Sequence, residues 1–514
     1  MDTRNSQSGP LIKAWLIAGV SLILGLLFDY FFVRKIPGIA FPLYVVLVVT
    51  GLFAIAHFFK KQLSKDVFWL LLPLIFFSAM VFIRSSVLLT FLNIVASLLL
   101  LLVIAEVSFS EKVKNFLVGD YIKIFFLPFK FIRPLFQTLS NLFSLRGVNK
   151  DQKVLSQVAK GILMTIPALF VFLLLFYSAD LIFQKYVLDL IGIGIKSETI
   201  FRSILVLIAT FVYIGAYTYS FREKENQITA QQSSKGHSVG HIESSILFGS
   251  VNVLFFIFIL VQLTYLFGGE SNISAQGLTF AEYARRGFFE LIVVAIISLL
   301  LLLFTEKYVV KKETDHTLGF KVLSTALAVQ VILIMVSAFT RLSLYEQAYG
   351  FTTLRLYSHA FIILLAGIFC LLLYKIYKDK RENTFAFRVF ISIVLSLAVI
   401  NFLNPDAFIA RRNIERLATT GKLDIDYLSR LSSDATPDII KVLNRLNEDS
   451  KQGFARALLS RRTKSSDSPY FPKWQSLNIS RMKADKILNL IMMSEIEPYE
   501  AYQQQNFGSV ERYK

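Results

Sequence analysis

The residues best suited to chemistry in this sequence are ionisable side chains at the edges of long apolar segments. A charged group at membrane depth is costly, so each one is by default a candidate functional residue. Arginine side chains among them can hold a carboxylate or phosphate through two parallel hydrogen bonds. We expect the candidates to share one face of a bilayer, and they are Asp29, Asp180, Arg285, Arg286, Glu290, Arg341, Glu346, Arg355, Asp406, Arg411 and Arg412.

These boundary charges also fit a purely structural role. Charges at the ends of membrane helices pair with each other, cap helix termini and contact lipid headgroups. In that case they would hold an external domain against the helices without binding a ligand. The sequence leaves both interpretations open, one a binding surface for a ligand or partner and the other a set of structural ion pairs.

Other motifs carry less weight. Residues 236–240 match the G-x-S-x-G pattern, but they follow a polar linker where a nucleophilic serine needs a buried strand. The single cysteine, Cys370, excludes a disulfide within the chain and any zinc site built from cysteines. With no phosphate-binding glycine loop and no Cys/His metal spacing, the sequence predicts no catalytic residue, no metal and no cofactor.

The composition indicates whether the chain folds in water or in a lipid bilayer. Of 514 residues, 55% are hydrophobic and 18% charged, and 49 are phenylalanine. A soluble domain carries about 25% charged residues. The composition therefore excludes a soluble enzyme, a disordered protein and a secreted disulfide scaffold.

Eleven apolar segments are long enough to cross a bilayer, which needs about 20 residues per helix. They run over residues 11–33, 39–59, 67–83, 87–107, 158–179, 199–221, 245–267, 288–305, 320–339, 354–377 and 385–403. The predicted fold is all-α: a polytopic bundle of about eleven transmembrane helices over residues 1–403, followed by a small helical domain outside the membrane over residues 404–514.

The connecting segments alternate in basicity. With the N-terminus in the cytoplasm, inside segments carry clusters such as Lys60, Lys61 and Lys65, whereas outside turns carry pairs or single residues such as Arg84. This is the positive-inside bias, and it accounts for much of the net charge of +18 without a nucleic-acid partner. Eleven spans then place the C-terminal domain on the extracytoplasmic side.

Residues 108–153 mix phenylalanine and isoleucine with lysine and arginine. The segment is too interrupted to span the membrane and too apolar to be a free loop. Amphipathic helices lying in the cytoplasmic interface fit this composition, with the cations near anionic headgroups. Such a segment could regulate or couple the bundle, or simply rest on the membrane as a long connection.

Several local strings resemble an uncharacterised family of bacterial polytopic membrane proteins, domain of unknown function 4173, which is related to family 4153. They include Phe28-Asp29 with Pro37-Gly38, Ser178-Ala179-Asp180, residues 282–291, residues 341–350 running on to Thr353-Leu354-Arg355, Asn404-Pro405-Asp406-Ala407 with residues 409–414, and residues 428–435. Leu181 stands where that family is expected to have proline. The resemblance implies a bacterial cytoplasmic-membrane protein and supplies no activity.

Two classes of function follow. The first is a non-enzymatic membrane protein, transport-like, sensing or an envelope-associated scaffold, whose outer cluster binds an envelope ligand or protein. The alternative is a membrane-embedded transferase acting on a lipid-linked substrate, with Asp29 as general base and the arginines holding a lipid phosphate. The short turn after Asp29 weighs against the transferase, and Asp29→Asn discriminates between the two. The oligomeric state is not predicted.

Overall fold

The protein is helical throughout the part described by the computed structural model, which covers residues 5–109, 112–143, 197–222, 241–267, 288–308, 314–378, 381–421, 423–443, 451, 454, 458 and 473–491. The long helices are α1 (Asn5–Phe32), α2 (Ala40–Phe58), α3 (Lys65–Ile83), α4 (Val87–Val107), α10 (Ser197–Phe221), α11 (His241–Phe267), α14 (Phe288–Tyr308), α15 (Thr314–Tyr349), α16 (Thr353–Tyr377) and α17 (Glu382–Leu403).

Eight of these helices are long and apolar enough to cross a membrane, namely α1 to α4, α10 and α15 to α17. Helices α11 and α14 contain shorter apolar stretches, Ser245–Val261 and Glu290–Thr305. The predicted span over residues 158–179 lies outside the described residues. Multiple apolar helices of this length confirm that the chain is a multi-pass membrane protein.

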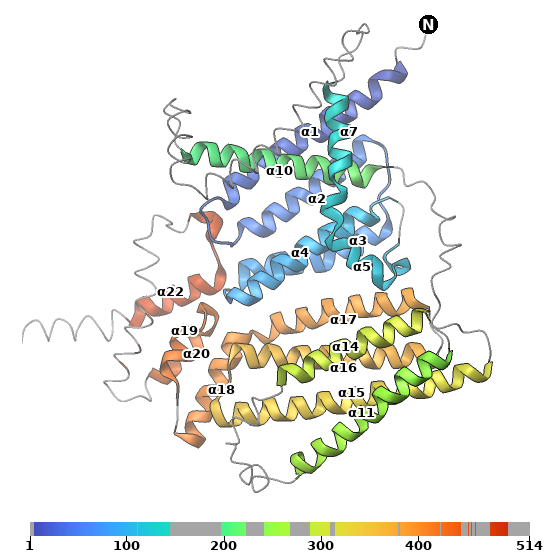
Figure 1. Ribbon diagram of the computed structural model, residues 1–514. Coiled ribbons are helices and arrows are strands. Elements are labelled where there is room, and N and C mark those ends of the chain that lie inside the picture. The colour runs from blue at the N-terminus through green and yellow to red at the C-terminus, as the bar shows by residue number, and fades with distance from the viewer. Residues whose placement is uncertain are drawn as a thin grey trace, which may run out of the picture.

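The long helices form two packed groups (Figure 1). Helices α1 to α4 and α10 share one apolar core, whereas α11 and α14 to α16 share another. Helix α17 packs Phe387 and Phe390 against the first core and Phe385 within the second, so it joins the two groups. The outward faces are apolar too, for example Leu72 and Val87, as expected of helices whose solvent is lipid.

Helix α15 extends further than the predicted span over residues 320–339. Its 36 residues correspond to about 54 Å of helix, well beyond the roughly 30 Å apolar core of a bilayer. Arg341 and Glu346, expected beside the turn after this span, therefore lie within the last turns of the helix. The sequence placed the end of the helix too early because its apolar run stops before its helical hydrogen bonding does.

The segment after α4 forms short helices, η1 (Val113–Asn115), α5 (Val118–Phe125), α6 (Leu127–Lys130) and α7 (Ile132–Phe143). Their position in the membrane interface stays a prediction. Helix α7 packs against α1 and α10. Several large apolar side chains stay exposed, among them Phe125, Phe126 and Phe129. The part of this prediction that covers residues 144–153 lies outside the described residues.

The C-terminal elements are α18 (Pro405–Thr420), α19 (Ile425–Arg430), η3 (Ser433–Ala435), α20 (Thr436–Leu443), η4 (Trp474–Ser476) and α22 (Ile479–Ile491). They share a small apolar core of their own that includes Ile409, Leu428, Ile439 and Leu488. In Figure 1 they lie together at one end of the long helices. We refer to these described elements as the C-terminal helices.

Candidate functional site: the face where the C-terminal helices meet the bundle

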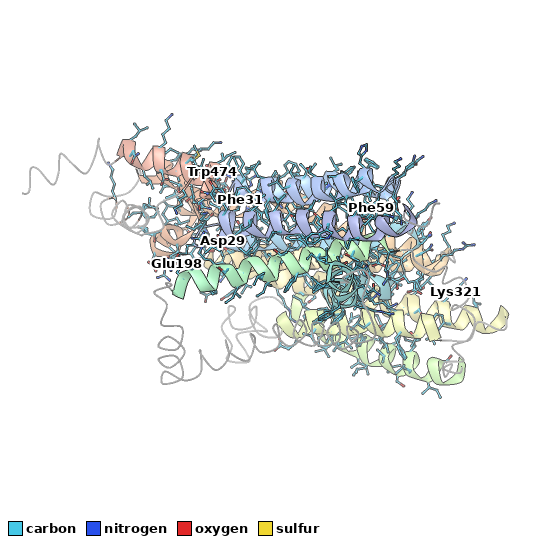
Figure 2. The ribbon with its side chains drawn as sticks, turned by 90° about the horizontal axis from the view of Figure 1, so that it is seen from above. Asp29, Phe31, Phe59, Glu198, Lys321 and Trp474 are labelled. Carbon is cyan, nitrogen blue, oxygen red and sulfur yellow. The ribbon has the colours of Figure 1, made fainter. Side chains whose placement is uncertain are left out.

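Three helix–helix turns of the bundle lie against the C-terminal helices. They are the α1–α2 turn (residues 33–39), the α3–α4 turn (residues 84–86) and the α15–α16 turn (residues 350–352), and each is hydrogen-bonded to a different part of the C-terminal helices. We call these three turns the docking face. In Figure 2, Asp29, Phe31 and Trp474 mark this end of the molecule, whereas Phe59 and Lys321 lie toward the other end.

The α1–α2 turn pairs with the segment that leads into α22. The Ile39 amide donates to the Leu477 carbonyl at 2.9 Å, and Arg481 Nη2 donates to the Pro37 carbonyl at 2.7 Å. At Gly38 the backbones approach so closely that an added Cβ would lie 2.4 Å from the Leu477 oxygen. Any larger residue at Gly38 would therefore push the two segments apart.

Trp474 adds an aromatic contact to this turn. Its ring meets Phe31 edge-on, with centroids 5.9 Å apart, and its indole N–H donates to the Tyr30 hydroxyl at 3.4 Å. A tryptophan with one apolar and one polar contact suits a membrane boundary, where the surroundings change from lipid to water. The contact joins the end of α1 to a segment more than 400 residues later.

The α3–α4 turn is held by a buried carboxylate, Asp434. Its Oδ2 accepts hydrogen bonds from the backbone amides of Ser85 at 2.7 Å and Ser86 at 2.9 Å. The hydroxyls of Ser432 and Ser480 also contact this carboxylate, which is only 5% exposed. The amides at the start of a helix have no partner within the helix, so Asp434 caps α4 from outside.

Asn478 completes the same junction on the side of α3. Its side-chain amide donates to the carbonyl oxygens of Val81 at 3.1 Å and Arg84 at 2.8 Å. The carbonyls in the last turn of a helix also lack partners within the helix. Both helix ends that meet at this turn are therefore capped by the C-terminal helices.

Asp406 lies beside Asp434 and is even more buried, at 4% exposed. It sits in the first turn of α18, where Asn404 adopts a left-handed backbone conformation and Pro405 starts the new helix. The Ser432 amide donates to Asp406 Oδ2 at 3.2 Å. Burial raises the pKa of Asp406, and the neighbouring charge of Asp434 adds to the rise.

The α15–α16 turn is held by two side chains of α18. Asn413 bonds both the amide and the carbonyl of Phe351, each at 2.8 Å, and Arg416 donates to the carbonyls of Gln347 at 3.0 Å and Ala348 at 2.6 Å. Gly350 has a positive φ of 85°, and an added Cβ there would lie 2.6 Å from Asn413 Oδ1. Glycine at this position permits both the turn and the contact.

A chain of polar contacts runs through the ends of α15 and α16. Ser343 Oγ lies 3.3 Å from His359 Nε2, and His359 Nδ1 lies 3.4 Å from Glu346 Oε1. The order of hydroxyl, imidazole and carboxylate matches that of a nucleophilic serine site. However, Ser343 donates to the Phe339 carbonyl within α15, and this negative end of a helix disfavours an oxyanion. The arrangement is therefore better suited to joining two helices.

Asp29 is held by an ion pair that the sequence did not predict. Arg202 of α10 donates through Nε to both carboxylate oxygens, at 3.0 and 3.1 Å, and through Nη2 to Oδ2 at 2.5 Å. One turn earlier, Glu198 pairs with Arg34 at 2.9 Å. Arg202 and Glu198 lie in the helix that crosses next to α1, and only their packing shows that they face Asp29 and Arg34.

The remaining predicted site residues are engaged individually. Arg355 donates to the Gly350 carbonyl and stacks over the Tyr345 ring, with 4.0 Å to the ring centroid. On α18, Arg412 pairs with Glu415 at 3.0 Å. Arg411 of the same helix lies 4.0 Å from Asp438, Arg341 is buried in α15, and Glu290 is exposed at the start of α14. The other three predicted residues, Asp180, Arg285 and Arg286, lie outside the described residues.

The structure thus brings Asp406 into the junction with the α3–α4 turn and leaves Asp29 in a separate ion pair at the same end of the bundle. The sequence did not predict the residues that make most of the contacts between the C-terminal helices and the docking face, namely Asp434, Asn478, Asn413, Arg416 and Trp474. Asn413 and Asp434 lie within the strings that carried the family resemblance, which was the one available signal for them. Among the described residues, no group of three His, Cys, Asp or Glu side chains could hold a metal ion.

Comparison with known proteins gives a family and no close relative. Residues 71–442 match the family described as Domain of unknown function (DUF4153). This range includes two of the three turns of the docking face, together with Asp406 and Asp434. No curated protein and no solved structure matches the chain. Because the match covers more than half of the chain, this membrane protein belongs to the family described as Domain of unknown function (DUF4153).

Proposed function

We propose that this protein is a non-enzymatic sensor of the bacterial cell envelope, in which the C-terminal helices bind an external ligand or partner and pass the event to the bundle. One observation carries the proposal. The C-terminal helices are hydrogen-bonded to three separate turns of the docking face, so a movement of these helices acts on α1 to α4, α15 and α16 together.

The charge distribution supports an orientation with the docking face outside the cytoplasm. The opposite ends of the helices carry Lys60, Lys61, Lys65, Lys112, Lys114, Lys375, Lys378 and Arg381. The turns of the docking face carry only Arg34, Lys35 and Arg84. Cytoplasmic loops are richer in lysine and arginine, so the N-terminus is cytoplasmic and the C-terminal helices are extracytoplasmic in this proposal.

We further propose eleven spans and a domain boundary at residues 403–404. Ten long helices are described, and the sequence supplies one more apolar segment at residues 158–179. Helix α17 ends at Leu403, and the left-handed Asn404 and Pro405 then redirect the chain into α18. An odd number of spans puts the two ends of the chain on opposite sides of the bacterial cytoplasmic membrane.

The ligand or partner surface is proposed to lie on the outward side of α18. Arg411 and Arg412 each expose about half of their side chains, 52% and 50%. Their acidic neighbours Asp438 and Glu415 leave donors of both guanidinium groups available to water, so an anionic group of an envelope component can bind there.

The transferase alternative receives no support from the surroundings of Asp29. A general base needs a lone pair directed at the substrate, whereas both oxygens of this carboxylate already accept hydrogen bonds from Arg202. In addition, the nearby acidic side chain of Glu198 is itself paired with Arg34 at 2.9 Å.

The test compares three full-length variants in a strain that lacks the gene. We expect Asp29→Asn to restore the wild-type phenotype, whereas Asp434→Ala should not, because it leaves the amides of Ser85 and Ser86 without their acceptor. Asp426→Asn is the matched control, since Asp426 is an exposed carboxylate on α19. Full rescue by Asp434→Ala at normal protein level would overturn the sensor proposal, and loss of function in Asp29→Asn alone would favour the transferase.

A further inference from the structure

We propose that Asp406 is a proton-binding site: its carboxyl group is a neutral acid when the C-terminal helices are docked, and loss of that proton loosens them from the α3–α4 turn. This inference rests on the proposed function for its consequence, because docking is the coupling step of the sensor. The proton site itself rests only on the surroundings of Asp406.

The hydrogen bonds around the two carboxyl groups are unevenly shared. Asp434 receives the two turn amides and two serine hydroxyls, so both of its oxygens have donors. On Asp406, the Ser432 amide donates to Oδ2, and the hydroxyls of Ser432 and Ser86 also interact with the carboxyl group. Among the described residues no donor lies within hydrogen-bond range of Asp406 Oδ1, although that atom is buried. A buried carboxylate with one unpartnered oxygen is poorly compensated for the loss of water.

A proton on Asp406 resolves this shortage. The acid form turns one oxygen from an acceptor into a donor, so it needs an acceptor nearby in place of a second donor. The hydroxyls of Ser86 and Tyr357 both interact with Asp406. The Tyr357 hydroxyl is buried and has no hydrogen-bond partner within the described part of the chain. The acid form of Asp406 can therefore donate to one of these hydroxyl oxygens, and it removes the charge from a buried carboxyl group.

The charged groups on the surrounding elements do not supply a hydrogen-bond donor to the unpartnered oxygen of Asp406. Asp434 of η3 adds a like charge, and the start of α18 adds the positive end of a helix, which favours the ionised form. Two arginines at the junction donate to backbone carbonyl groups: Arg84 donates to Asn401 at 2.7 and 3.0 Å, and Arg481 donates to Pro37. Farther out, Asp438 of α20 pairs with Lys441 and with Arg411, and Glu346 of α15 pairs with His359 of α16.

The direction of the pH effect follows from linkage. Burial raises the pKa of Asp406 above its ordinary value, so the docked form binds the proton more tightly than an undocked form does. The contribution of this proton to docking is fully present below the ordinary pKa of an aspartic acid. It is lost as the pH rises through the raised value. Acidification of the cell exterior therefore strengthens docking, and alkalinisation weakens it.

The experiment uses the full chain in lipid nanodiscs and two measurements over a pH series. Infrared difference spectroscopy detects the C=O stretching band of a protonated carboxyl group. Hydrogen–deuterium exchange of peptides that contain Ser85, Ser86 and Ser432 reports on docking. We expect a carboxyl band that titrates above the ordinary range of aspartic acid, together with exchange at these amides that accelerates over the same pH range beyond its intrinsic pH dependence.

The variants identify the group. Asp406→Asn keeps the shape of the neutral acid, so it should abolish the band and make docking independent of pH. The matched control Asp426→Asn should behave as wild type, and Asp434→Asn should move the titration of Asp406 to lower pH because a like charge is removed. The proposal is overturned if the band is missing in wild type, or if it persists in Asp406→Asn.

These results stay separate from the test of the sensor. A carboxyl band that belongs to Asp406 supports the proton site even if Asp434→Ala rescues the gene deletion, in which case only the sensor proposal fails. Conversely, loss of rescue by Asp434→Ala with no band from Asp406 leaves the sensor standing and overturns the proton site.

Discussion

Asn93 of α4 and Asn401 of α17 exchange hydrogen bonds inside the bundle, with each side-chain amide nitrogen 2.8 Å from the other's oxygen. Both residues are fully buried. The backbone oxygen of Asn401 also accepts from Arg84, which follows the last residue of α3. One polar pair thus ties the α3–α4 hairpin to α17, the helix that joins the two cores and leads into α18.

The first prediction concerns this pair. Asn93→Ala should destabilise the protein by about 1–2 kcal/mol, because it leaves the buried side-chain oxygen of Asn401 without its donor. The double variant Asn93→Ala/Asn401→Ala should lose less unfolding free energy than the two single variants lose together. Thermal unfolding in one detergent, followed by far-ultraviolet circular dichroism, gives the double-mutant cycle, and strict additivity would contradict the pairing.

Gly38 gives the second prediction. Gly38→Ala should weaken the contact of the α1–α2 turn with residues 474–477, because the new Cβ meets the Leu477 carbonyl. The expected loss is about 1–3 kcal/mol, with a change in Trp474 fluorescence. Gly19→Ala is the control, since a Cβ at Gly19 has no neighbour within 4 Å among the described atoms. Equal effects of the two substitutions would argue against close packing at Gly38.

The ion pair between Asp29 and Arg202 gives the third. Arg202 is 45% exposed and Asp29 13%, so solvent screens the pair and its loss should cost only about 1 kcal/mol. Arg202→Ala and Asp29→Asn should each lower the unfolding temperature by similar small amounts, and the charge reversal Asp29→Arg/Arg202→Asp should recover part of the loss. If the double reversal has an unfolding temperature no higher than that of Asp29→Arg alone or Arg202→Asp alone, the two side chains do not form a direct pair.

Ser343 gives the fourth. We expect no labelling of Ser343 by a fluorophosphonate probe, because its hydroxyl donates to the Phe339 carbonyl at the negative end of α15. Mass spectrometry of the treated protein provides the measurement, with a serine hydrolase in the same sample as a positive control. Labelling of Ser343 that depends on His359 would instead establish a nucleophilic serine.

The short helices after α4 give the fifth. Nitroxide labels at positions 125 and 129, placed in a Cys370→Ser background, should be accessible to dissolved oxygen, because Phe125 and Phe129 are exposed apolar side chains at the expected membrane interface. Labels at Lys123 and Lys130 should be more accessible to a water-soluble nickel complex. Power-saturation electron paramagnetic resonance distinguishes the two groups, and uniform access to nickel would place these helices in water.

Much of the architecture could be predicted because membrane helices carry a strong local signal. Apolar length and the scarcity of charge predicted helices at 87–107 and 385–403, and the helices found there are Val87–Val107 and Glu382–Leu403. The prediction failed locally at α15, where helical hydrogen bonding continues past the apolar run through Arg341 to Tyr349. In a polar boundary region, the apolar length of a segment no longer defines where its helix ends.

The sequence by itself determined that this chain is embedded in a bilayer and which charged residues lie at the ends of its helices. Both properties depend on residues that are close together in the chain. Only the tertiary structure decided which charges meet. Arg202 faces Asp29 across 173 positions, and Asp434 caps a helix that begins almost 350 positions earlier. Pairing at such separations depends on how helices pack and turn. It left Asp406 buried beside a second carboxylate, with one Asp406 oxygen unpartnered among the described residues.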